Sequence, residues 1–129
     1  MSSVNLSDYK KIYLETAKEY IDNLYRSCKE LENNPTNKEA LRELHISAHS
    51  LRSQSQVMNY TNISNLTGTI ERIARGLLDG TYNIDNRFTS FLEKAITELN
   101  LSLTDIEKAD KERDLKSLLK ELEGLYKTL

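Results

Sequence analysis

Hydrophobic residues recur along this chain at alternating steps of three and four positions, which is the period of the buried face of an α-helix. The pattern is clearest from about position 37 to 58, where one stripe is almost entirely apolar: Leu41, Leu44, Ala48, Leu51, Ser55 and Met58. No glycine or proline interrupts this segment, and Thr36 followed by Glu39 forms a capping box in front of it. The stripe predicts the inward face of a bundle helix over 37–58.

The same spacing predicts four more helices, over 7–32, 62–79, 86–107 and 111–127. The stripe of the first of these is Tyr9, Ile12, Tyr13, Ala17, Tyr20, Ile21, Leu24, Cys28 and Leu31. The next two stripes are Ile63, Leu66, Ile70, Ile73 and Leu77, and then Phe88, Phe91, Leu92, Ala95, Ile96, Leu99, Leu103 and Ile106. Short connections force consecutive helices to run antiparallel. We therefore expect an all-α fold, an antiparallel up-down four-helix bundle with an additional C-terminal helix, and a single domain over residues 1–129. The last helix is either an extra packed helix or the start of a linker.

Residues at the ends of these segments support the boundaries. Pro35 stops the first helix, and Gly80 ends the third. Thr61 or Asn62 can cap the start of the third helix, and Asp85 can cap the fourth.

Composition agrees with a helical protein, because only four glycines and one proline occur among 129 residues. A formal net charge of −2 gives no bulk attraction to nucleic acid or to anionic lipid, so neither is expected as a partner. No apolar run approaches the length of a membrane span, and no signal sequence precedes the first helix. The single cysteine, Cys28, follows the apolar spacing and fits a reducing compartment. We therefore expect a cytoplasmic protein.

Candidate chemistry lies beside the apolar stripes, where His49 and Glu71 each follow a stripe residue by one position. If their helices pair antiparallel, both side chains lie on one exposed seam. A carboxylate that accepts a hydrogen bond from Nδ1–H fixes the imidazole tautomer and leaves the Nε2 lone pair free as a nucleophile. The alternative is that His49 is an ordinary surface residue and Glu71 a solvated acid paired with Arg72 or Arg75.

The residues around this histidine read Ala48-His49-Ser50-Leu51-Arg52-Ser53. They resemble the motif Ala-His-Ser/Thr-Leu/Ile-Lys-Gly of the histidine-phosphotransfer (HPt) domain, which lies at the N-terminus of chemotaxis histidine kinases of the CheA type. The resemblance continues without a gap through Tyr60, where that family usually has Phe, to Glu71, where it has a glutamate bonded to the phosphorylatable histidine. It also covers Tyr13-Leu14-Glu15-Thr16-Ala17 near the start of the chain.

This resemblance implies that His49 accepts a phosphoryl group from the ATP-binding domain of a histidine kinase. The histidine then passes it to an aspartate of a response-regulator receiver domain. Glu71 is implied to orient the imidazole, and Arg52, where the family usually has lysine, to contact the phosphate. The sequence contains no glycine-rich phosphate loop and no acidic cluster suited to Mg²⁺. The chain is therefore expected to be a phosphoryl acceptor and carrier without cofactor or metal, and the N-terminal domain of a larger chemotaxis kinase.

Some positions depart from the family pattern. Ser53, Gln54 and Gln56 replace small residues that let a receiver domain approach. Gly68 stands where some relatives carry a second histidine. These changes either narrow the choice of partner or mark a degenerate, non-phosphorylated helical interaction module. His45 precedes His49 by one helical turn, a spacing that can chelate zinc, but no third ligand of clear spacing follows.

Overall fold

A computed structural model describes residues 6–126 of the chain, with side chains from residue 8 onward. Five helices make up most of this part: α1 (Leu6–Asn33), α2 (Lys38–Val57), α3 (Thr61–Leu78), α4 (Asn86–Ala109) and α5 (Lys116–Leu125). The all-α prediction is confirmed. The first four predicted helices agree with the structure to within two residues at each end.

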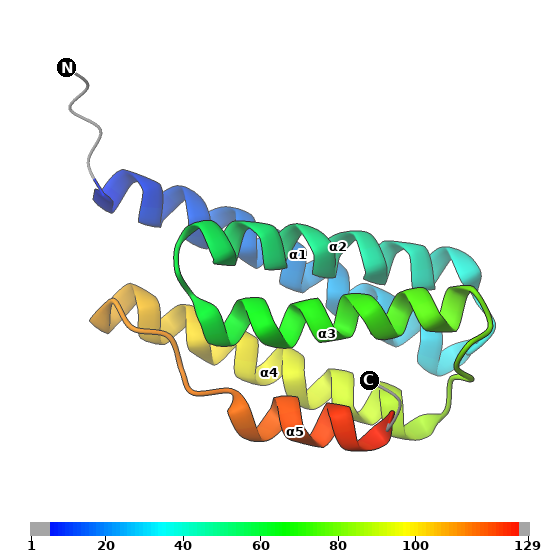
Figure 1. Cartoon of the computed structure of the whole chain (residues 1–129). Coiled ribbons are helices and arrows are strands. Elements are labelled where there is room, and N and C mark those ends of the chain that lie inside the picture. Colours follow the sequence, from blue (N-terminus) through cyan, green and yellow to red (C-terminus); the bar gives the residue numbers. More distant parts are fainter. Residues whose placement is uncertain (1–5, 127–129) are drawn as a thin grey trace.

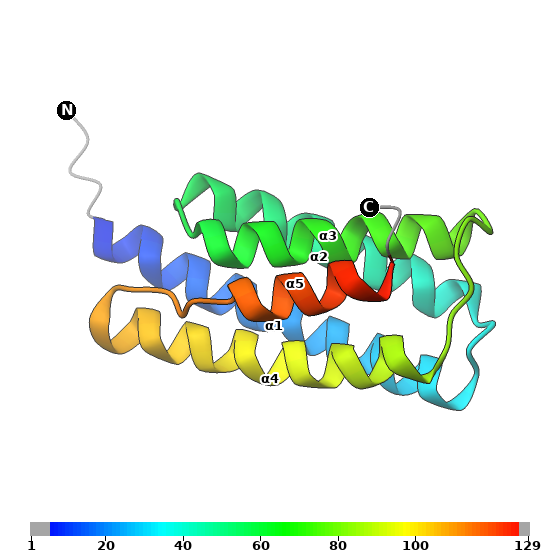
Figure 2. The ribbon, with the colours of Figure 1, turned by 60° about the horizontal axis from the view of Figure 1, so that its bottom comes forward.

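Consecutive helices run antiparallel, as the short connections predicted (Figure 1). α1 packs against α2 and α4, and α2 packs against α1 and α3. α5 lies between α3 and α4 and contacts both of them (Figure 2). Of the two expectations for the last helix, the packed helix is therefore correct within the described residues.

The predicted apolar stripes form the core. All stripe residues of α3 and α4 are buried, and on α2 Leu44, Ala48 and Leu51 have no exposed surface. On α1 the prediction is wrong for Tyr9 and Ile12, which are 50% and 61% exposed, because these side chains lie on the outer flank of that helix. Within the described part of the chain, no helix is both long and apolar enough to cross a membrane.

The residues at two helix ends, Gly80 and Asp85, agree with those predicted from the sequence, whereas the N-cap of α2 lies one residue later. Asn37, not Thr36, caps α2, because its side chain accepts a hydrogen bond from the backbone N–H of Ala40. Asp85 caps α4 as expected. Gly80 follows α3 with φ of +85°, a left-handed backbone conformation that glycine adopts without strain.

The fifth helix begins later than predicted, since residues 111–115 are not helical and α5 starts at Lys116. Side chains of α3 and α4 bind the backbone of this segment. The backbone N–H of Arg113 donates to Ser102 Oγ, and that of Leu115 donates to Asn62 Oδ1, both at 3.0 Å. The predicted end at 127 lies outside the described residues.

Candidate functional site

His49 and Glu71 face each other from the central turns of α2 and α3. Each side chain leaves its helix one position after a fully buried residue, Ala48 on α2 and Ile70 on α3. Because the two helices pair antiparallel, the two flanks meet. His49 Nδ1 lies 2.8 Å from Glu71 Oε2, which is a hydrogen-bond distance.

The two side chains of this pair differ in their exposure to solvent. The imidazole of His49 is 51% exposed, whereas the carboxylate side chain of Glu71 is only 7% exposed. The sequence placed both side chains on an exposed seam, or took Glu71 as a solvated acid paired with Arg72 or Arg75. The expected exposure of Glu71 is wrong, whereas its pairing with Arg75 is present at 3.7 Å. The flank of α3 that carries Glu71 is turned toward α2, so α2 covers the carboxylate while the histidine ring reaches the surface.

Arg52 completes the cluster from the turn of α2 that follows His49. Its Nε donates to Glu71 Oε1 at 2.8 Å, and its Nη2 lies 3.1 Å from His49 Nδ1. Its Nη1 lies 3.4 Å from Gln56 Oε1, a long contact. The structure therefore brings together the three candidate residues that the sequence identified, with the guanidinium on the Nδ1 side of the ring.

The charge of Glu71 is set by competing effects on its pKa. Burial by itself raises the pKa of the carboxyl group, because a charged group loses hydration. Hydrogen bonds from Arg52 and His49 lower it, and together they hold the pKa below its usual range. Arg75 Nη2 adds a further positive group at 3.7 Å from Oε2. Glu71 is therefore ionised at neutral pH.

An ionised carboxylate can only accept hydrogen bonds, and this assigns the tautomer of His49. Nδ1 lies 2.8 Å from the negative Glu71 Oε2 and 3.1 Å from the donor Arg52 Nη2. We assign the proton by the shorter contact, because an unprotonated Nδ1 would place its lone pair against the carboxylate oxygen. The proton therefore lies on Nδ1 and is donated to Glu71. The lone pair then lies on Nε2, the outer nitrogen of a half-exposed ring, which is the condition for a nucleophilic imidazole.

His45 lies closer to this cluster than its sequence position suggested. Its Nε2 atom is buried without a hydrogen-bond partner in the described part of the chain, and lies 3.9 Å from Glu71 Oε2. The spacing of four residues from His49 is the signal that could have placed both rings on one carboxylate.

Potential metal ligands gather elsewhere in the described residues. A group of Cys28, Glu32 and Glu93 joins α1 and α4, and Lys29 Nζ contacts both of its carboxylates.

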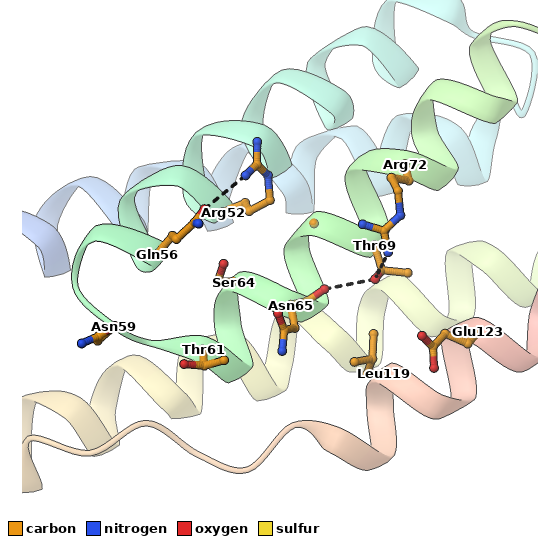
Figure 3. Close-up of a pocket in the computed structure, with 11 residues that line it drawn as sticks. Arg52, Gln56, Asn59, Thr61, Ser64, Asn65, Thr69, Arg72, Leu119 and Glu123 are labelled. Atoms are coloured by element: carbon orange, nitrogen blue, oxygen red, sulfur yellow. Dashed lines mark hydrogen bonds between the residues drawn. The ribbon is translucent and has the colours of Figure 1, made fainter. Parts of the chain in front are cut away.

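A polar groove of about 480 Å³ opens beside the cluster, between α2, α3 and α5. Figure 3 shows Arg52 on α2 and Arg72 on α3 at its wall, with Leu119 and Glu123 of α5 on the opposite side. Arg72, which the sequence offered as a partner of Glu71, instead donates from Nη2 to Thr69 Oγ1 at 2.8 Å. The groove shares Arg52 with the histidine site, so the two features adjoin.

Comparison with known proteins finds similarity to chemotaxis proteins. No family model matches the chain. It is 22% identical over 121 residues to chemotaxis protein CheA of Bacillus subtilis (strain 168), covering 93% of this chain and 18% of that protein. It is 23% identical over 111 residues to chemotaxis protein CheA of Halobacterium salinarum (strain ATCC 29341 / DSM 671 / R1), covering 85% of this chain and 17% of that protein.

These matches are distant homology over most of the chain to the N-terminal region of CheA proteins, the region of the HPt domain. The chain spans less than a fifth of the length of the curated relatives it matches. The sequence motif had indicated the same relatives.

Proposed function

We propose that this chain is a histidine-phosphotransfer domain of two-component chemotaxis signalling, in which His49 carries the phosphoryl group. The observation that carries the proposal is the contact of 2.8 Å between His49 Nδ1 and the buried carboxylate of Glu71. It leaves Nε2 unprotonated on a ring that is 51% exposed. Distant homology to the N-terminal region of CheA proteins supports the same function.

The proposed partners are the ATP-binding domain of a histidine kinase and the receiver domain of a response regulator. In the first step His49 Nε2 attacks the γ-phosphorus of ATP bound to the kinase. A nitrogen–phosphorus bond forms, the bond to the bridging oxygen breaks, and ADP leaves with that electron pair. The ring is then positively charged, and the contact of Nδ1–H with Glu71 stabilises that charge. In the second step a receiver aspartate oxygen attacks phosphorus, and the electron pair returns to Nε2.

Arg52 has two proposed parts in this reaction. Its Nε donates to Glu71 Oε1 and so holds the acid in place beside the ring. Its Nη2 lies 3.1 Å from His49 Nδ1 but forms no hydrogen bond with it while Nδ1 carries the proton. Among the described residues, its Nη1 has only the long contact with Gln56 Oε1, and we propose it as the nitrogen available to a phosphoryl oxygen. We therefore propose Arg52 as the phosphate contact and also as a group that orients Glu71.

The test is phosphorylation of the purified chain by the catalytic part of a chemotaxis kinase added in trans with Mg-ATP. We expect acid-labile label on the parent chain and none on His49→Gln. The variant His45→Gln is the matched control, because it removes the neighbouring imidazole and should keep most of the label. A cognate receiver domain should then remove the label. Modification of His45 instead of His49 would overturn the assignment.

The kinase partner is required because this chain carries only the acceptor. An imidazole oriented by one carboxylate supplies no metal-held triphosphate, which γ-phosphoryl transfer needs. Incubated alone with Mg-ATP, the chain should stay unlabelled. Labelling by ATP alone would show that the chain is itself a kinase.

The second candidate function is a degenerate helical interaction module that is not phosphorylated. An apolar groove of about 280 Å³ between α1 and α2 favours it, because Ser53 and Gln54 line this groove together with exposed Tyr9, Ile12 and Val57. A folded chain that no cognate kinase labels would support this function. In that case Ser53 and Gln54 are the first positions to substitute by glycine, in order to test whether small residues there restore labelling. The cytoplasmic location and the single-domain organisation stay predictions.

A further inference from the structure

Gly68 lies on α3, one turn before Glu71, at the point where the side chain of Arg52 crosses from α2. A Cβ atom added to Gly68 would lie 2.8 Å from Arg52 Cδ and 3.6 Å from Arg52 Cγ. Real Cβ atoms essentially never approach another carbon to 2.8 Å, so one of the two groups must shift. The stem of Arg52 therefore occupies the space that a side chain at position 68 would fill.

The stem of Arg52 has little freedom to shift while its present contacts are kept. Beyond Cδ, Nε donates to Glu71 Oε1 at 2.8 Å, and Nη2 lies 3.1 Å from His49 Nδ1. Before Cγ, the residue is anchored in the middle of α2. A displacement of Cδ therefore pulls the guanidinium away from the carboxylate, and this carboxylate is buried, so water does not readily replace the lost donor.

We propose that Gly68 is a positioning residue. Because it has no side chain, it leaves a passage beside α3, the space through which Arg52 reaches Glu71. Glu71, held by Arg52, in turn orients the imidazole of His49. This inference rests on the proposed phosphotransfer function for its effect on rate, but its geometry is independent of that function. It assigns to Gly68 a role in the reaction without contact to the reacting atoms.

The first test, made on the 129-residue chain, asks whether a side chain at position 68 weakens the contact between Arg52 and Glu71. Carbon NMR titration of the Glu71 carboxyl group in Gly68→Ala should give a higher pKa than in the parent, because the Arg52 hydrogen bond is weakened. The matched control is Gly124→Ala on α5, since a Cβ there meets nothing within 4 Å among the described residues. Alanine is the better helix former at both positions, so a general effect on helix stability would appear in both variants. An unchanged Glu71 titration in Gly68→Ala would overturn the proposal.

The second test measures phosphoryl transfer from a chemotaxis kinase. Gly68→Ala should slow labelling by roughly tenfold or more, because displaced orienting groups cost rate steeply, while Gly124→Ala keeps the parent rate. In an Arg52→Ala background, adding Gly68→Ala should change the rate by less than about twofold, since the two substitutions then act through the same contact. Full additivity of the two effects would show that Gly68 acts by another route.

The two tests separate this inference from the proposed function. If no kinase labels the parent chain, the phosphotransfer function fails, while the titration of Glu71 still decides whether Gly68 provides the passage. If the parent is labelled and Gly68→Ala has both an unchanged titration and an unchanged rate, the phosphotransfer function stands and the role of Gly68 is wrong.

Discussion

The carboxylate of Glu112 lies 3.0 Å from the backbone nitrogen of Ile63, although 49 positions separate the two residues. Its other oxygen accepts the backbone N–H of Asn62, also at 3.0 Å. These are among the first backbone donors of α3, which have no acceptor within the helix. Tyr60, at the N-cap position, provides no side-chain cap. Glu112 therefore caps α3 from the segment between α4 and α5, and its negative charge lies at the positive end of that helix.

Removal of this cap should destabilise the fold. We expect Glu112→Ala to lower the free energy of unfolding by about 1 kcal/mol, the usual cost of losing a helix cap. Urea unfolding followed by circular dichroism would measure it. Lys111→Ala is the matched control, because this exposed neighbour lies in the same non-helical segment. Equal stability of the two variants would show that Glu112 contributes nothing as a cap.

The cap at Glu112 illustrates what the sequence could not provide. Helix positions followed from local spacing, since each apolar stripe repeats within its own segment. The sequence placed the cap of α3 at Thr61 or Asn62, because local rules place an N-cap next to its helix. A cap supplied by a distant segment depends on tertiary packing, and the late start of α5 at Lys116 has the same cause.

The candidate site shows a similar division between local and tertiary information. His49 and Glu71 each follow a buried stripe residue by one position, and helical geometry fixes the angle of that step. The sequence therefore correctly placed the two residues on facing flanks. Spacing within a helix does not show how closely the next helix covers a flank, so the burial of Glu71 was missed. The path of Arg52 over Gly68 was missed for the same reason, since it joins two helices.

Leu51 tests the rotation of α2 about its own axis. Its side chain is fully buried in the core, two positions after the half-exposed His49. We expect Leu51→Ala to destabilise the chain by ~2–5 kcal/mol, the range for removing a large buried aliphatic side chain. Val57→Ala is the control, because Val57 is 85% exposed, and should stay within about 0.5 kcal/mol of the parent. Equal unfolding midpoints for both variants would contradict this orientation of the helix.

Cys28 should be unreactive in the folded chain. Burial, followed by the nearby carboxylates of Glu32 and Glu93, raises the pKa of its thiol to about 12. The reactive thiolate is therefore scarce at neutral pH, and the side chain has no exposed surface. We expect an aromatic disulfide reagent to modify Cys28 only as fast as the chain opens, with a rate that rises when urea is added. Complete modification within seconds in native buffer would contradict this placement.

The stabilisation that ionised Glu71 gives to the folded chain should be lost as the pH falls. Hydrogen bonds from Arg52 and His49 outweigh burial and hold the folded-state pKa of its carboxyl group below the ordinary value of 4.5. As the pH falls past that value, the unfolded chain takes up the proton first, which favours unfolding. The stabilisation from ionised Glu71 is therefore complete at neutral pH and is lost as the pH falls from 4.5 through the lower folded-state pKa.

Urea unfolding of the parent and of Glu71→Gln at neutral pH and in steps below about pH 4.5 measures this effect. The variant lacks the titrating group, so the stability difference between parent and variant should be largest at neutral pH and should shrink with acidification. Glu43→Gln is the control, because it makes the same substitution at an exposed carboxylate on α2. A difference that grows on acidification would mean that burial raises the pKa of Glu71 and that its contacts with Arg52 and His49 do not outweigh it.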